Sequence, residues 1–290
     1  MKDERPSLTA AWVAAARTYG ALLPERYRLA DDPYGASLAG ARLLERLANT
    51  RIGRALSVRP GLGTFIAYMQ VRTRVLDDMV RAFVAQPGAQ LVVLGAGYDT
   101  RALRLPELAG VPVFEIDHPA TQRRKQRALG RLGATSPARY VTWDFETRPL
   151  DELPAELARA GLDRGAPVLT IWEGVTMYLT EGAIDASLRA IRAWSGPGSQ
   201  LAMTYFERTR ITHRAPLLRL MRIAVKRLGE PFLWGWQAEE VAPYLAQRGW
   251  EVVTNRSLDD AAYDFWPAEL ARIVRSRGSR YALANLGGLA

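Results

Sequence analysis

The stretch Leu91-Val92-Val93-Leu94-Gly95-Ala96-Gly97-Tyr98-Asp99-Thr100-Arg101 decides the fold of this chain. Its four leading apolar residues are typical of a strand that is buried on both faces, as in a parallel sheet. The strand runs into Gly-x-Gly, where missing side chains allow a tight turn and a close approach to a ligand. A helical segment, Thr100 to Leu108, and a second apolar strand, Val111 to Ile116, should follow. This order predicts an α/β, Rossmann-like fold.

Asp117 comes directly after the second strand, about 20 residues past the glycines, where an acid accepts hydrogen bonds from ribose hydroxyls. We therefore expect an adenosine-containing cofactor. A dinucleotide site prefers a third glycine where this chain has Thr100, and the preceding Asp99 would repel a phosphate. S-adenosylmethionine (SAM), which carries a sulfonium and an ammonium, fits better than NAD. The alternative is that Gly95-Ala96-Gly97 forms only a tight turn.

Two later blocks extend this pattern, Phe114-Glu115-Ile116-Asp117-His118-Pro119 and Trp172-Glu173-Gly174-Val175-Thr176-Met177-Tyr178-Leu179-Thr180. Together with the glycine stretch, they resemble the signature blocks of the SAM-dependent leucine carboxyl methyltransferase superfamily. That superfamily includes bacterial O-methyltransferases of polyketide and other secondary metabolism. The resemblance extends from about Asp32 to the last strand. It implies a class I methyltransferase fold with a seven-stranded, mostly parallel sheet, and it does not identify the substrate.

The composition is that of an ordinary globular protein, with 48% hydrophobic and 24% charged residues in 290. We expect one α/β domain with an elaboration. The sequence has no long apolar run and begins Met-Lys-Asp-Glu-Arg, which is unlike a signal peptide, so we expect a cytoplasmic protein. The absence of cysteine excludes disulfides, thiolate metal sites and thiol catalysis. With only two histidines, no metal site is expected.

The net charge of +9 could suggest nucleic-acid binding. Of 39 basic residues three are lysines, which leaves 36 arginines spread along the whole chain, a bias typical of a GC-rich genome. We therefore expect a small-molecule acceptor and neither nucleic acid nor membrane as partner; the oligomeric state stays open. The basic cluster Arg123-Arg124-Lys125-Gln126-Arg127 is predicted to be a solvated helix face. A second basic cluster, Arg208 to Arg227, could receive an anionic acceptor.

Residues 1–86 should form a helical cover over the cofactor, and residues 87–290 the SAM-binding core. Helices are predicted at Thr9 to Thr18, Ser37 to Leu47 and Thr64 to Val84. In the last of these, Arg72 could hold a carboxylate with its guanidinium fork. The family resemblance implies that Arg72 binds the carboxylate of SAM. Arg74 is interpreted as a surface or ion-pair residue, and Arg17 and Tyr19 receive no role.

Further cofactor contacts are expected where strands end. Asp144-Phe145 follows a third strand, Arg139 to Trp143, where related methyltransferases hold adenine; Asp144 could instead cap a turn. Glu173 ends a fourth strand, Pro167 to Trp172, and should attract the ammonium or sulfonium. The predicted cofactor-binding residues are Arg72, Gly95, Ala96, Gly97, Asp117, His118, Asp144, Phe145 and Glu173. Thr180 should cap a helix that ends near Trp194.

A long insertion, Glu207 to Trp236, separates a fifth strand, Gln200 to Phe206, from a helix, Gln237 to Arg248. Long insertions at a ligand face are usually lids or binding loops. The predicted substrate contacts are Tyr178, Arg214, Trp234 and Trp236, and His213 is a candidate general base for a phenol. Alternatively, the insertion packs on the sheet or on another subunit and its arginines face water. The strands Trp250 to Thr254 and Arg280 to Leu286 should form an antiparallel pair at the sheet edge.

These features favour a SAM-dependent O-methyltransferase that acts on a carboxylate, phenol or enol oxygen of a small metabolite, for example a polyketide-like one. A nicotinamide-dependent oxidoreductase is the alternative enzyme. A non-catalytic scaffold or partner-binding protein that kept the SAM fold is the alternative without chemistry.

Overall fold

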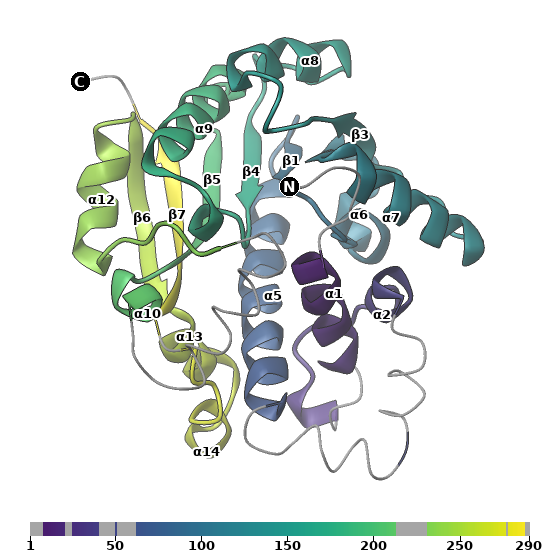
Figure 1. The fold of residues 1–290 in the computed structure, drawn as a ribbon, viewed down its shortest axis with the longest axis vertical. Coiled ribbons are helices and arrows are strands. Elements are labelled where there is room, and N and C mark those ends of the chain that lie inside the picture. Colours follow the sequence, from purple (N-terminus) through teal and green to yellow (C-terminus); the bar gives the residue numbers. More distant parts are fainter. Residues whose placement is uncertain are drawn as a thin grey trace.

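The computed structural model describes residues 8–20, 25–40, 50, 62–212, 231–276 and 278–287. Its centre is a seven-stranded sheet with the order β3-β2-β1-β4-β5-β7-β6 (Figure 1). The strands are β1 (Gln90–Leu94), β2 (Val113–Asp117), β3 (Arg139–Thr142), β4 (Val168–Trp172), β5 (Gln200–Phe206), β6 (Trp250–Ser257) and β7 (Ser279–Leu286). Strands β1 to β5 are parallel, and β7 runs antiparallel to β5 and β6. The predicted sheet and its antiparallel edge pair are confirmed.

Helices cover both faces of the sheet because strand side chains alternate between the faces. The described helices are α1 (Leu8–Gly20), α2 (Gly35–Ala39), α5 (Leu62–Val84), α6 (Arg101–Arg104), α7 (Pro119–Arg131), α8 (Leu153–Arg159), α9 (Glu181–Trp194), α10 (Arg208–Thr212), α12 (Ala238–Ala246), α13 (Leu258–Phe265) and α14 (Ala268–Ala271). Short 3-10 turns are η1 (Glu25–Tyr27), η2 (Pro106–Leu108), η3 (Leu150–Glu152) and η4 (Thr176–Tyr178). In β1, Val92 and Leu94 join a cluster with α8, α9 and α12, whereas Leu91 and Val93 pack toward α5 and α6. None of the described helices has the length and apolar character needed to cross a membrane.

The strand order reverses between β1 and β4, and ligands of open α/β sheets bind at the carboxyl edge of such a reversal. Helix α5 extends beyond this edge, with α1 on one side and α13 and α14 on the other (Figure 1). There a separate apolar cluster joins Ala16 and Met69 to Ala261 and Trp266. The N-terminal helices therefore share a hydrophobic cluster with C-terminal ones, and the boundary at residue 86 stays a prediction.

Two local predictions are wrong. The single helix expected from Thr100 to Leu108 is split, because Pro106 disfavours a helical conformation at Leu105, which has φ −96° and ψ 107°. The basic cluster on α7 is not wholly solvated: Lys125 is fully buried and forms an ion pair with Glu115 of β2. A carboxylate on a buried strand requires a counter-charge, and Lys125 supplies it. By contrast, Thr180 caps α9 as predicted, since its side chain accepts from Ala183 N.

Candidate functional site

The glycine turn after β1 requires glycine for two reasons. Gly95 and Gly97 have positive φ values of 70° and 52°, a region that favours glycine. A Cβ atom on Gly95 would lie 2.6 Å from Val175 Cγ2, and one on Gly97 would lie 3.1 Å from the Cβ of Ala10. The turn is also fixed to β2, because the amides of Gly95 and Ala96 both donate to the Ile116 carbonyl at 2.9 Å.

Asp117 faces this turn from the end of β2. Its Oδ2 accepts from Gly97 N at 2.5 Å and its Oδ1 from His118 N at 2.7 Å. Burial raises the pKa of Asp117, although the two backbone amides act in the opposite direction. A carboxylate has about four acceptor positions, so capacity remains for ribose hydroxyls. His118 contributes structurally, since its Nδ1 accepts from Ala120 N at 3.2 Å and caps α7.

A buried charge cluster lies at the carboxyl end of β4. It consists of three arginines and three acids, which are Arg72, Asp77, Asp99, Arg101, Arg104 and Glu173; their side chains are 1% to 11% exposed. Glu173 is central to it. Its Oε1 accepts from Arg72 Nε at 2.7 Å and its Oε2 from Arg101 Nη2 at 2.8 Å. The structure therefore brings together two predicted cofactor residues, Arg72 from α5 and Glu173 from the sheet.

The electrostatics of the cluster keep Glu173 and Asp99 ionised. Burial alone would raise the pKa of Glu173, but Arg72 and Arg101 outweigh this effect and hold that pKa well below its usual range. The pKa of Asp99 is likewise lowered against the effect of burial, mainly by Arg101. Because cations and anions balance, a ligand that carries both an ammonium and a carboxylate can dock beside the cluster without leaving a net buried charge.

Helix α1 covers the glycine turn through Arg17. The guanidinium of Arg17 donates to the Tyr98 carbonyl at 2.5 Å and to Asp32 Oδ2 at 2.8 Å. Sequence reasoning gave Arg17 no role and did not consider Asp77, Arg101 or Arg104 as site residues. The available signal was Arg101 itself, which immediately follows the glycine turn within the block that resembles the family.

Asp144 and Phe145 follow β3, next to the strand that ends in Asp117, and Trp143 N donates to the Asp117 carbonyl at 2.9 Å. Asp144 Oδ1 accepts from Glu146 N at 3.0 Å, so Asp144 does cap a turn. One oxygen of its carboxylate is thereby engaged, and the other has no hydrogen-bonding contact within the described part of the chain. Phe145 is 40% exposed, which leaves its ring free to lie against a ligand.

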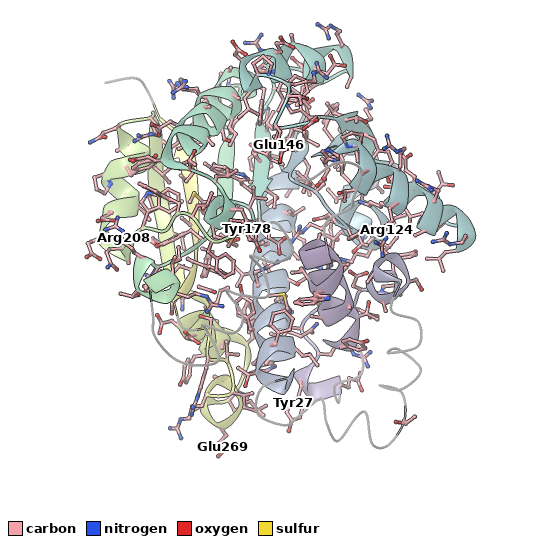
Figure 2. All side chains as sticks on the ribbon, viewed as in Figure 1. Tyr27, Arg124, Glu146, Tyr178, Arg208 and Glu269 are labelled. Carbon is pink, nitrogen blue, oxygen red and sulfur yellow. The ribbon has the colours of Figure 1, made fainter. Side chains whose placement is uncertain are left out.

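The end of the insertion docks on the loop that follows Glu173. Leu233 N donates to the Met177 carbonyl at 2.7 Å, and Tyr178 stacks on Phe232 with ring centroids 5.5 Å apart. Tyr178 lies near the middle of the view in Figure 2, whereas Arg208, at the start of the insertion, lies at the periphery. Trp234 is half-buried.

Trp236 does not fit its predicted role as an acceptor contact. It is 2% exposed and packs edge-on against Tyr205 in the core, so it has no face to offer a substrate. Its burial follows from the backbone, because Trp236 pairs with Glu207 in a β-bridge beside the sheet. His213 and Arg214 lie outside the described residues. Arg74 forms the predicted exposed ion pair, with Asp78 at 2.7 Å.

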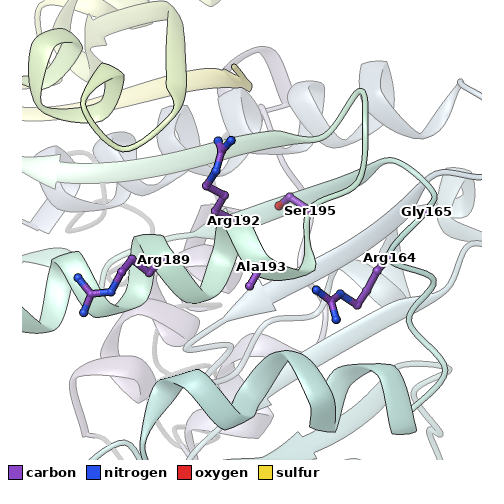
Figure 3. A pocket seen from close by; sticks show the side chains of 6 residues that line it. All are labelled: Arg164, Gly165, Arg189, Arg192, Ala193 and Ser195. Carbon is purple, nitrogen blue, oxygen red and sulfur yellow. The ribbon is translucent and has the colours of Figure 1, made fainter. Parts of the chain in front are cut away.

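A surface cavity of about 700 Å³ lies at the amino end of β4, away from Glu173, and is lined by Arg164, Arg189 and Arg192 (Figure 3). The three guanidinium groups point in different directions, and Arg192 is engaged by the Gly249 carbonyl at 2.8 Å. The cavity also adjoins the last turn of α9, where the helix dipole disfavours anions. We assign it no part in the site.

The side chains at the carboxyl edge of the sheet fit SAM. Asp117 suits ribose hydroxyls, Glu173 an ammonium and Arg72 a carboxylate, and the turn at Gly95 and Gly97 is open to close approach. Among the described residues no group of His, Cys, Asp and Glu could hold a metal ion. The strand order and this set of side chains define a class I SAM-dependent methyltransferase.

Comparisons with known proteins identify the family. The family model for leucine carboxyl methyltransferase matches residues 10–192, so the chain belongs to that family. A protein of Mycolicibacterium smegmatis, provisionally named an S-adenosyl-L-methionine-dependent methyltransferase, is 34% identical over 257 residues, which cover 85% of this chain and 82% of that protein. A Mycobacterium avium protein with the same provisional name is 32% identical over 97% of this chain and 94% of its own length. SAM is accordingly the cofactor.

Solved structures agree at the level of the fold. The crystal structure of a provisionally named methyltransferase from Thermobifida fusca matches with a TM-score of 0.57 and 19% identity, over 99% of this chain and 97% of that one. A DUF574 family protein from Streptomyces avermitilis matches with a TM-score of 0.57 and 17% identity, over 93% of this chain and 96% of that one.

Proposed function

We propose that this methyltransferase transfers the methyl group to an oxygen of a small acidic metabolite, with a carboxylate as the preferred acceptor. SAM supplies an electrophilic methyl group on its sulfonium. The proposal rests on one observation. Every acid and arginine of the buried charge cluster is paired within the cluster, so these acids are engaged as ion-pair partners and do not serve as a base. An acceptor that is already ionised needs no base from the protein, whereas a phenol with a pKa near 10 benefits from one.

The chain's residues would then act by binding and orientation. Asp117 would hold the ribose, Phe145 and Asp144 the adenine, and Arg72 with Glu173 the amino-acid end. Holding both reactants in near-attack geometry can contribute about 7–11 kcal/mol to catalysis without proton transfer. The role of His213 as a base stays a prediction for phenolic acceptors alone.

The acceptor would lie against aromatic side chains at the ends of β4 and β5. Tyr178 stacks on Phe232, and Phe206 meets Phe232 edge-on at 5.3 Å. Phe206 is the last residue of β5 and Tyr178 lies in the turn that follows Glu173, and flat apolar walls of this kind suit a planar acceptor. Trp234 extends the same surface, while Trp236 supports it from the core.

The acceptor atom is tested by product analysis. The protein is incubated with SAM carrying a deuterated methyl group and a panel of aromatic and aliphatic carboxylic acids, phenols and amines, and products are identified by mass. Mild alkali then separates the oxygen products, because it releases labelled methanol from a methyl ester and leaves an aryl ether intact. Labelled esters are expected. A product labelled on nitrogen or carbon would refute oxygen transfer, and ethers alone would refute the carboxylate preference.

The cofactor site is tested by calorimetry with SAM. Asp117→Ala and Arg72→Met should each weaken binding by about 1–3 kcal/mol, the range for a buried polar partner that is lost. Arg74→Met is the matched control, since Arg74 lies on the same helix but pairs with Asp78 at an exposed position. It should bind SAM like the parent protein. Unchanged affinity in both site variants would show that SAM is held elsewhere.

A further inference from the structure

Arg101 is the most highly connected member of the buried charge cluster. It is 2% exposed at the start of α6, directly after the glycine turn. Its Nη2 donates to Glu173 Oε2 at 2.8 Å, its Nε to Asp77 Oδ1 at 2.9 Å and its Nη1 to Asp99. Its backbone amide also donates to Asp99 Oδ1 at 2.7 Å. The guanidinium is therefore fixed from three sides, and Glu173 is one of the groups that it holds.

The contact with Arg101 controls how Glu173 faces Arg72. Arg72 gives Glu173 a single hydrogen bond, from Nε to Oε1, and its Nη1 lies 3.4 Å from the Tyr68 hydroxyl. An arginine and a carboxylate left alone prefer a fork with two parallel hydrogen bonds. In such a fork, the guanidinium and the carboxylate would direct two hydrogen-bonding atoms at each other and not at a ligand. With Oε2 turned toward Arg101, Glu173 meets Arg72 through Oε1 alone, and the fork is not formed.

Helix α5 gives this arrangement its support. Asp77 lies on α5, as Arg72 does, and is itself 1% exposed. Arg104 donates to Asp77 Oδ1 at 2.7 Å and so shares the acid that anchors Arg101. Arg104 has no recorded contact with Glu173 within the described part of the chain, although it occupies the same buried surroundings as Arg101.

We propose that Arg101 is a positioning residue for the amino-acid end of the cofactor, acting through Glu173. By holding Oε2, it keeps Oε1 and the outer part of the Arg72 guanidinium directed toward the ammonium and carboxylate of the ligand. The inference rests on the proposed roles of Arg72 and Glu173. It assigns to Arg101 a selective effect on ligands that carry the amino-acid end, which a purely structural residue would not have.

The test compares two ligands that differ at that end. S-adenosylhomocysteine has the ammonium and carboxylate, and 5′-methylthioadenosine has the same nucleoside and thioether without them. In Arg101→Met, calorimetry should show S-adenosylhomocysteine weakened by about tenfold or more and 5′-methylthioadenosine unchanged within about twofold. Arg74→Met is the control, because Arg74 pairs with Asp78 outside the cluster, and it should bind both ligands within about threefold of the parent. Arg101→Lys, which keeps the charge with fewer donors, should show a smaller loss with the same selectivity.

A double variant shows whether Glu173 carries the effect. In a Glu173→Gln background, Arg101→Met should cause little further loss of S-adenosylhomocysteine affinity, because the group that Arg101 positions is already altered. The proposal would be overturned if the losses of affinity from Glu173→Gln and Arg101→Met were additive. It would also be overturned if Arg101→Met weakened the binding of both ligands equally, or if it left the binding of both unchanged. If Arg101→Met does not fold, Arg101→Lys decides by the same ligand comparison. Failure of the parent protein to bind S-adenosylhomocysteine would instead overturn the proposed cofactor site.

Discussion

Replacing Gly95 with alanine is expected to destabilise the protein through two separable effects. The backbone at Gly95 has φ 70°, and the left-handed region costs an alanine about 1–2 kcal/mol. The added Cβ would also lie 2.6 Å from Val175 Cγ2. Val175 is β-branched and packs against the main core cluster, so it has little freedom to turn away. Overpacking of this kind costs about 1–3 kcal/mol, which gives a total of about 2–5 kcal/mol.

Matched variants isolate each contribution. Gly88 has φ 74° and nothing within 4 Å of an added Cβ, so Gly88→Ala reports the backbone effect alone. Val175→Ala removes the methyl groups that obstruct residue 95. In that background, Gly95→Ala should cost only the backbone contribution. The free energy of unfolding is measured by urea denaturation followed by circular dichroism. Calorimetry with SAM should show weaker binding for Gly95→Ala and parental binding for Gly88→Ala.

The comparison of Gly95→Ala with Gly88→Ala can refute the role given to Val175. If Gly95→Ala is no more destabilising than Gly88→Ala, Val175 yields freely and the close approach does not constrain the turn. If Val175→Ala leaves the full cost of Gly95→Ala in place, the obstruction comes from another group.

Three further predictions concern buried groups. Lys125→Met should lower the free energy of unfolding by about 3–5 kcal/mol in urea, because Glu115 loses its buried partner; burial raises the pKa of Glu115 to about 7 even beside Lys125, so the unpaired carboxyl must take up a proton. Adding Glu115→Leu should restore much of the loss. Glu173 has a lowered pKa when folded and a usual one near 4.5 when unfolded, so its stabilisation is complete at neutral pH and is lost as the pH falls. Between pH 7 and pH 4 the free energy of unfolding of the parent should therefore fall by about 0.8 kcal/mol more than that of Glu173→Gln. An equal fall in the two proteins would contradict the ion pairs of Glu173. Trp236→Ala should cost about 3–5 kcal/mol of stability, and a variant with parental stability and altered acceptor choice would instead place this ring in the substrate site.

The strands and the ends of β2 and β4 could be predicted from the sequence because their signals are local. Unbroken apolar runs mark strands that are buried on both faces, and acids directly after such runs fall at the carboxyl edge of a parallel sheet. Asp117 and Glu173 are found there. The sheet order then brings both acids to one edge without any further information.

The charge cluster could not be predicted because its contacts are distant in sequence. Arg72 and Glu173 are 101 positions apart, and Arg17 and Tyr98 are 81 apart. Nothing local marks Lys125 as the buried member of its basic run, and Arg101 is distinguished from the other arginines only by its place after the glycine turn in the block that resembles the family. Helices α13 and α14 were also missed; their apolar residues join a cluster with α5 and with Tyr281 of β7.

The position of α5 has a consequence for how the protein unfolds. Its first half contributes Met69 and Val71 to the cluster beyond the sheet, and its second half contributes Leu76 and Val80 to the sheet core. Arg72 sits at the junction. A cofactor held there would resist separation of the two cores, adding a stabilisation that grows with the logarithm of its concentration. Amide hydrogen exchange should therefore slow in α13 as well as in the glycine turn, and the methyltransferase should unfold as one cooperative unit when SAM is abundant and in two stages when it is scarce.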